Sequence, residues 1–169
     1  MSAFLDEIEA AVPALRRYAR ALTRNADRAD DLVQDCLERA IRKRRLWLPT
    51  GPLRSWLFKM LLNLYRNETR RDRRRGDHVP LDAMTIEPST PAPQPGRLAL
   101  AEMARAIDIL PADQREALLL VVLEGMSYAD AARILGIPDG TLMSRLSRAR
   151  AALRGMTGFH EEPRLRTVK

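Results

Sequence analysis

The sequence predicts an all-α protein of two small helical domains joined by a Pro-rich flexible linker, with a helix-turn-helix in the second domain. Apolar residues recur every three or four positions through most of the 169 residues, which is the period of a helix. No window shows the sustained polar–apolar alternation of a half-buried strand. Four prolines crowd residues 88–95 and separate two blocks that have the helical pattern.

Three helices are expected in the first block, over residues 4–24, about 27–45 and about 53–73. Pro13 lies inside the first pattern and is expected to kink or restart that helix, because proline has no backbone N–H. Asn25 precedes the second helix, and the stretch WLPTGP ends it. The apolar residues expected on inner faces are Phe4, Ile8, Val12, Leu15, Ala19, Leu22, Leu32, Val33, Cys36, Leu37, Ala40, Ile41, Leu53, Leu57, Met60, Leu61 and Leu64.

The segment from Gly76 to Gly96 changes character and is predicted to be the linker. It contains TIEPSTPAPQPG, with few large apolar groups to offset the entropy lost on ordering. Proline-rich chain favours extended geometry, so at about 3.1 Å per residue this segment could reach roughly 65 Å.

The second block predicts a helix from Leu98 to Leu110 and another that begins with Pro111 as its first helical residue and runs to Glu124. A final helix is expected to end near Gly155, a plausible cap. The tail at residues 156–169 has mixed charge, and no structure is assigned to it.

Residues 127–150, SYADAARILGIPDGTLMSRLSRAR, predict a helix-turn-helix. Ser127 is a good N-cap with Asp130 three positions on, Gly136 suits a left-handed turn, and Pro138 starts the next helix. Small residues give the first helix a close-packing face, and the second helix has one apolar stripe with hydroxyls and arginines beside it. The alternative is that these arginines are only the solvated face of an amphipathic helix. The packing residues are Ala131, Ala132 and Leu135, then Leu142, Leu146, Ala149 and Leu153.

Charge is unevenly spread along the chain. There are 29 Lys+Arg against 22 Asp+Glu, for a net charge of +7, and nearly all of the bases are arginine. Residues 1–40 have a net charge of −2, whereas residues 42–75 have a net charge of +10. Because arginine suits phosphates and guanine edges, the first segment suits a protein partner and the second a polyanion.

Several classes of function are disfavoured. One cysteine, Cys36, with only His78 and His160 beside it, makes a structural zinc site improbable. No phosphate-binding glycine loop, catalytic triad pattern or metal-ligand spacing is present, so neither an enzyme nor a cofactor is expected. Acidic residues interrupt the apolar start, and no apolar run is long enough for a bilayer. A cytoplasmic protein without membrane insertion is expected.

Both blocks resemble domains of bacterial sigma factors. The stretch LPADQREALLLVVLEGMSYADAARILGIPDGTLMSRLSRARAAL resembles the domain that binds the promoter −35 element. ADDLVQDCLERA and LRSWLFKMLLNLYRNETRR resemble the domain that binds the −10 element. The short linker, with no domain between, is similar to the extracytoplasmic-function (ECF) group. ADRADDLVQ and DQREALLLV resemble the alphaproteobacterial general-stress branch.

The resemblance covers residues 10–155 and implies an RNA polymerase sigma factor that directs promoter-specific initiation. It implies domains at residues 1–75 (core polymerase and −10 binding) and 97–155 (−35 binding), a linker at 76–96 and a tail at 156–169. The implied partners are core RNA polymerase (β and β′ subunits), promoter DNA and an anti-sigma factor that holds the protein inactive.

The resemblance also implies roles for individual residues. Core-polymerase binding falls to Asp31, Gln34 and Asp35, which would dock on the coiled-coil clamp of the largest subunit. Binding of the −10 element falls to Trp56, Lys59, Asn63, Arg66, Arg70, Arg73 and Arg74, with RRDRRR at 70–75 on phosphates and LWLPTGP near a flipped base. Binding of the −35 element falls to Ser127, Thr141, Met143, Ser144, Arg145 and Arg148.

Two positions depart from the family pattern. Met143 stands where relatives often have a basic residue, and Ser147 where some have an aromatic one. Readout at −35 is therefore expected to depend more on Thr141, Ser144, Arg148 and DNA shape.

Alternatives stay open for these residues and for the chain. Trp56 could be plain core, and the acidic face at 31–35 an ordinary solvated surface. The chain could be a one-component repressor with residues 1–75 as its sensor, or a sigma-mimicking interaction module. The linker could be a passive tether. Otherwise, because the third helix and the faces of residues 98–124 are partly apolar and basic, they have reason to close on each other or on a partner.

Overall fold

The computed structural model describes residues 2–46, 51–76 and 95–157, and every regular element in these ranges is helical. The first domain consists of α1 (Ser2–Thr23), α2 (Ala26–Arg42), a short 3-10 turn η1 (Arg44–Leu46) and α3 (Leu53–Arg75). The second consists of α4 (Pro95–Ile109), α5 (Ala112–Leu118), a π-helical turn η2 (Leu119–Leu123), α6 (Tyr128–Leu135) and α7 (Asp139–Thr157). The predicted all-α class with two helical domains is confirmed.

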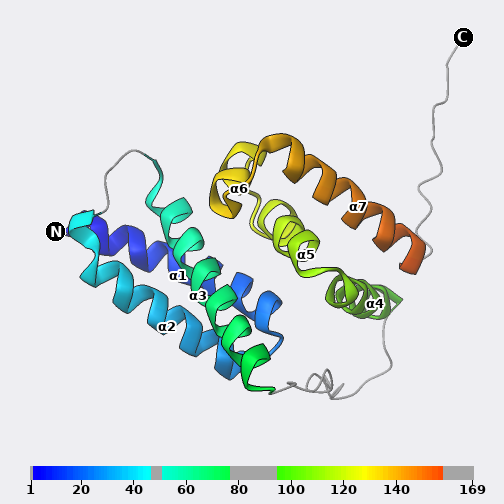
Figure 1. Ribbon diagram of the computed structural model, residues 1–169, viewed down its shortest axis with the longest axis horizontal. Coiled ribbons are helices and arrows are strands. Elements are labelled where there is room, and N and C mark those ends of the chain that lie inside the picture. Colours follow the sequence, from blue (N-terminus) through cyan, green and yellow to red (C-terminus); the bar gives the residue numbers. More distant parts are fainter. Residues whose placement is uncertain (1, 47–50, 77–94, 158–169) are drawn as a thin grey trace, which may run out of the picture.

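The first domain is a three-helix bundle in which α1, α2 and α3 pack on one another (Figure 1). Asn25 is the N-cap of α2, and its side-chain oxygen accepts a hydrogen bond from the Arg28 backbone N–H at 2.9 Å. The expectation that Pro13 restarts the first helix is wrong, because α1 continues through it. Burial of the helix on both sides of Pro13, from Ile8 to Leu22, compensates for the backbone hydrogen bond that proline cannot make.

Most of the expected inner-face residues of this bundle are buried. Ile41 is 44% exposed, since it lies in the last turn of α2. Four others are only partly buried: Phe4, Val12, Leu37 and Met60. Phe58 and Leu62, which the sequence analysis left out, are fully buried instead. The Phe58 ring packs against that of Tyr18, with 5.3 Å between centroids. The core face of α3 is therefore turned slightly from the predicted one.

In the second domain α4, α5 and α6 all pack against α7. Pro111 is the N-cap of α5 with extended backbone (ψ 143°), so the expectation that it is the first helical residue is wrong by one position. The predicted helix to Glu124 widens in its last turn, where the Glu124 backbone N–H donates to the Leu119 carbonyl at 3.1 Å.

The ends of the second domain also differ from expectation. Pro95 and Gly96 belong to α4, so the helix takes in the last two residues of the predicted linker. Gly155 is not a cap: it lies inside α7, which runs to Thr157 and so takes in the first two residues of the predicted tail. The rest of the predicted linker (77–94), the tail from 158, and residues 47–50 of the predicted base-capturing loop lie outside the described residues.

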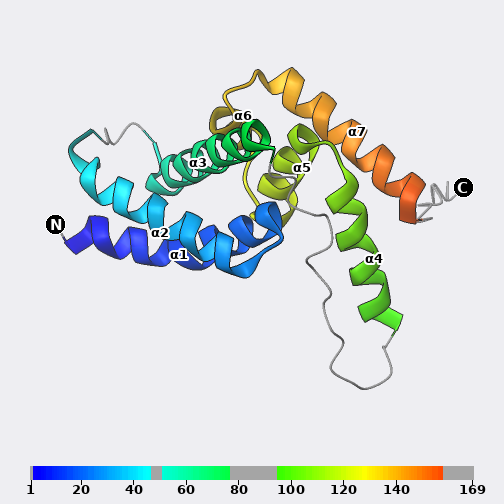
Figure 2. The same cartoon turned by 60° about the horizontal axis from the view of Figure 1, so that its bottom comes forward.

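The two domains pack against each other (Figures 1 and 2). α3 lies against α6, and α1 lies against η2. Buried apolar residues from both domains form one cluster. We call this packing the closed arrangement. None of the helices in the described ranges combines the length and apolar content needed to cross a bilayer.

Candidate nucleic-acid interface

The helix-turn-helix of the second domain is formed by α6 and α7, as predicted. The Ser127 hydroxyl accepts a hydrogen bond from the Asp130 backbone N–H at 3.1 Å and donates one to the Asp130 carboxylate at 2.8 Å. This is an N-cap reinforced by a side-chain pair, so Ser127 begins the helix. Gly136 ends α6 with φ +68°, the left-handed conformation that glycine adopts without strain.

The outer face of α7 presents small polar groups and cations. Its stripe of Leu142, Leu146, Ala149 and Leu153 is buried, as predicted. Thr141, Met143, Ser144 and Arg148 are exposed on the other faces of the helix, and the Met143 side chain is 57% exposed. An exposed face of this kind on the second helix of a helix-turn-helix can lie in a DNA major groove.

Arg145 lies apart from these residues. It is partly buried, and its Nε lies 3.4 Å from a carboxylate oxygen of Asp113 on α5. In the closed arrangement its guanidinium therefore contributes to packing α7 on α5. A contact that the sequence analysis missed joins the ends of the motif, where Arg150 Nη2 donates to the Tyr128 hydroxyl at 3.3 Å. The spacing of 22 residues gave no local signal for this pair.

The basic face of α3 is largely exposed. Lys59, Asn63, Arg70, Arg73 and Arg74 all reach solvent, so a polyanion has access to them. Trp56 is partly buried and packs against the core, which supports the alternative that it has a packing role. Trp56 still lies two helical turns before Asn63, on the same side of α3.

Arg66 is the exception on this face, because the second domain engages it. Its Nη2 lies 2.6 Å and its Nε 3.2 Å from Oε2 of Glu116. This hydrogen bond, with the charge of Glu116, raises the pKa of the Arg66 guanidinium above its ordinary value. The sequence predicts Arg66 to be one of the DNA-facing residues, but in the closed arrangement its guanidinium is paired with Glu116.

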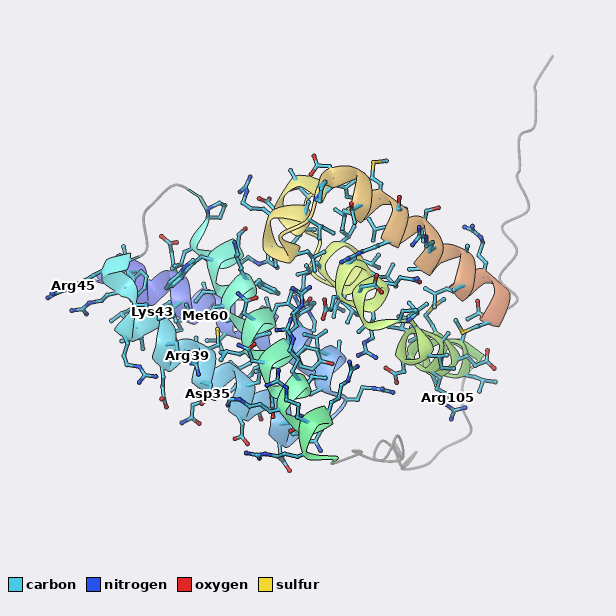
Figure 3. All side chains as sticks on the ribbon, in the orientation of Figure 1. Asp35, Arg39, Lys43, Arg45, Met60 and Arg105 are labelled. Atoms are coloured by element: carbon cyan, nitrogen blue, oxygen red, sulfur yellow. The ribbon has the colours of Figure 1, made fainter. Side chains whose placement is uncertain are left out.

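The acidic face of α2 is exposed as predicted. Asp31, Gln34 and Asp35 all reach solvent, and the Gln34 side-chain amide donates to Glu38 at 3.2 Å. Figure 3 shows Asp35 and Arg39 on α2 and Lys43 at its C-cap, each four residues after the last. Negative charge at the start of this helix and positive charge at its end give a surface suited to a protein partner.

Comparison with known proteins identifies the class to which this two-domain fold belongs. Residues 8–62 match the family model described as the Sigma2 domain of PhyR, and residues 100–153 match that of Sigma-70, region 4. A Sigma2 domain therefore precedes a Sigma-70 region 4 domain, in the order that the sequence predicts.

Relatives that match over both domains identify the group of sigma factors to which the chain belongs. The chain is 47% identical over 151 residues to the ECF RNA polymerase sigma factor EcfG of Rhodopseudomonas palustris, covering 88% of this chain and 81% of that one. It is 34% identical to the ECF sigma factor SigM of Mycobacterium tuberculosis, covering 86% and 72%. The chain therefore belongs to the ECF RNA polymerase sigma factors.

Solved structures agree with this assignment. The sigma factor RpoE of Bartonella quintana, solved in complex with the anti-sigma factor NepR, matches with a TM-score of 0.77 and 38% identity, over 94% of this chain and 99% of that one. CnrH, solved with the cytosolic domain of CnrY, matches with a TM-score of 0.68 and 28% identity, over 91% and 86%. The response regulator PhyR of Brucella abortus is 23% identical and shows the fold alone.

The chain is thus a transcription initiation factor that acts with RNA polymerase at promoters. The repressor alternative is excluded, since the first domain matches a sigma domain rather than a sensor. The 47% identity to EcfG over 88% of this chain favours a sigma factor over a sigma-mimicking module.

Proposed function

We propose that this protein is a cytoplasmic general-stress sigma factor that binds core polymerase through α2, reads the −10 element with α3 and reads the −35 element with α7. The observation that carries the proposal is the separation of exposed charge. Asp31 and Asp35 lie on α2, whereas the exposed cations of the DNA-facing set lie on α3 and α7. One protein can then hold a protein partner and a polyanion at the same time.

Each DNA-binding helix has its own task in this proposal. On α7, Ser144 and Arg148 read base edges, with Thr141 and Met143 beside them. On α3, Lys59 and Asn63 contact the −10 element, and the arginines at 70–75 bind phosphates without reading sequence. Ser127 brings the N-terminus of α6, with its free backbone N–H groups, to the DNA backbone.

Control by an anti-sigma factor is part of the same proposal. The RpoE relative that matches over both domains was solved with the anti-sigma factor NepR. We expect a protein of that class to hold this chain inactive until stress releases it. The expected mechanism is preferential binding to an inactive arrangement of the two domains, which shifts the population away from polymerase.

The decisive test is run-off transcription with purified protein and core polymerase. The wild type should direct transcription from its own promoter, and a NepR-class protein mixed in beforehand should suppress it. A repressor or a sigma-mimicking module would give no transcript under any of these conditions.

The docking face has a separate test. Replacing Asp31 and Gln34 by alanine should weaken core binding at least tenfold, because the variant lacks two polar side chains of the exposed face of α2. The circular dichroism signal of the helices should stay the same. The matched control replaces Glu9 and Glu102, which are exposed on α1 and α4. If the double variant binds core as tightly as the control, α2 is not the docking face.

A further inference from the structure

The closed arrangement is held by arginines of the first domain and carboxylates of the second. The Glu124 carboxylate accepts two hydrogen bonds from Arg17, from Nε at 3.0 Å and from Nη2 at 2.8 Å. Arg54 donates to the same carboxylate at 3.2 Å and to the Glu124 backbone carbonyl at 3.1 Å. Arg66 pairs with Glu116 in the same way, at 2.6 Å.

The contact is acidic on the side of the second domain. The sequence predicts partly apolar and basic faces over residues 98–124, and Arg115 does reach the first domain, where its Nη2 donates to the Tyr65 hydroxyl at 3.3 Å. The ion pairs to the first domain nevertheless come from carboxylates, of which Glu116 and Glu124 are the buried ones. Their side chains are 6% and 0% exposed. Burying a carboxylate is costly unless it is paired, so these two depend on arginines from the other domain.

The arginines remain partly open to solvent in the closed arrangement. The side chains of Arg17, Arg54 and Arg66 are 50%, 46% and 28% exposed. When the domains separate, each would lose its partner and present a free guanidinium. Arg54 and Arg66 lie on α3, the helix that also exposes Lys59 and Asn63.

The geometry of these pairs is the geometry by which arginine binds phosphate. Arg17 engages Glu124 with two parallel N–H groups, and the same planar fork matches two oxygens of a phosphate group. We propose that Arg17, Arg54 and Arg66 form a binding site for the phosphodiester backbone of promoter DNA, and that Glu116 and Glu124 occupy this site in the free protein.

The second domain and DNA then compete for the same cations. The free protein has low affinity for DNA until its domains separate, and any ligand that favours separation raises that affinity. Closure also uses neutral contacts, such as the hydrogen bond from the Tyr18 hydroxyl to the Glu116 carbonyl at 3.3 Å. Neutralising the carboxylates should therefore shift the equilibrium while both domains stay folded.

The first experiment replaces both carboxylates, Glu116→Gln with Glu124→Gln, in the full chain. The control, Glu9→Gln with Glu102→Gln, removes the same charge from exposed positions on α1 and α4. Small-angle X-ray scattering should show a larger radius of gyration for the first variant only. Its affinity for a fluorescent duplex of random sequence should rise at least tenfold above the control, because the arginines are released.

Scattering from the wild type provides a measurement that needs no substitution. Closure by ion pairs predicts expansion between about 0.05 M and about 0.5 M salt, where the range of screening shortens severalfold. If the wild type does not expand, and the glutamine variant matches its control in size and affinity, the carboxylates do not mask the site.

The second experiment tests the arginines in the Glu116→Gln, Glu124→Gln background. Arg17→Gln and Arg54→Gln should each weaken binding to the random duplex and reduce the slope of log affinity against log salt by about 0.9, the value for one phosphate contact. Arg16→Gln is the matched control, since Arg16 is an exposed neighbour on α1 that lies near Asp30. Unchanged slopes for Arg17→Gln and Arg54→Gln would overturn the phosphate site.

The inference rests on the proposed promoter-binding role. The results of these experiments distinguish a failure of that role from a failure of the phosphate site. If the open variant binds no DNA at all, the proposed role fails with it. If the open variant binds DNA tightly while Arg17→Gln and Arg54→Gln have no effect, only the site inferred here is wrong.

Discussion

At the scale of single residues, Cys36 shows how completely the first domain encloses a reactive group. The side chain is fully buried, and its Sγ donates to the Leu57 carbonyl at 3.5 Å. Burial raises the pKa of the Cys36 thiol from 9.0 to about 12, although the charge of Arg39 opposes this shift. Because the thiolate is the reactive form, the folded protein should be inert to thiol reagents at neutral pH.

The prediction is that iodoacetamide leaves Cys36 unmodified in the folded chain at about pH 8, where almost no thiolate forms. In denaturant the same reagent should modify the chain fully, and mass spectrometry would measure both. The raised pKa also stabilises the fold below pH 9.0, and this contribution is lost as pH rises toward 12. Stoichiometric modification of the folded chain on the same timescale would contradict this account.

The exposed faces of single helices could be predicted from the sequence, but the ion pairs between distant residues could not. The exposed side chains of α2, α3 and α7 followed from helical periodicity, because period alone separates a buried face from an exposed one. Arg66 and Arg145 have the same local pattern as their exposed neighbours, yet each pairs with an acid. Arg66 and Glu116 are 50 residues apart, and no local pattern connects them.

At the scale of elements, we expect α7 to read the DNA sequence and the C-terminal arginines of α3 to bind phosphates without reading sequence. Arg148→Ala should cost about 1–3 kcal/mol on the specific promoter and blur preference at one position of the −35 element. Arg74→Ala should weaken specific and random DNA alike and flatten the salt dependence. Competition binding with specific and random duplexes would measure both, and equal losses for Arg148→Ala on the two DNAs would remove the distinction.

The helices themselves were predictable, whereas several of their ends were not. Asn25, Ser127 and Gly136 act as the caps that their chemistry predicts. Gly155 does not end α7, because the buried Leu153 holds that turn against the core and the helix continues to Thr157. Tertiary packing overrides a weak local signal at such positions.

At the scale of the whole molecule, the two domains share one buried cluster and a set of ion pairs. The sequence analysis predicted that they had reason to close, since both carry apolar faces. Which residues meet was not predictable, because the partners lie 50 or more positions apart in the sequence and no local pattern connects them. The ion pairs Arg17–Glu124 and Arg66–Glu116 became visible only with the three-dimensional arrangement.

The closed arrangement predicts that the two domains must separate before the protein can bind both promoter elements. The two promoter elements lie about one and a half helical turns apart in the family, or roughly 50–55 Å at about 34–36 Å per turn. Arg24, the residue after α1, and Asp108 on α4 form an ion pair across the domains, with 3.6 Å between Nη1 and Oδ2, and both are partly exposed. Cysteines at these two positions, in a Cys36→Ala background, can therefore be joined by a short bismaleimide.

The cross-linked protein should lose run-off transcription, because α3 and α7 can no longer move to separate promoter elements and Arg66 stays paired. The same variant treated with a monofunctional maleimide is the control and should keep its activity, since its domains remain free to separate. Core binding through α2 should survive cross-linking, because Asp31 and Asp35 are exposed in the closed arrangement. Full transcription from the cross-linked protein would mean that promoter recognition proceeds with the domains together, and that the ion pairs between them have no regulatory role.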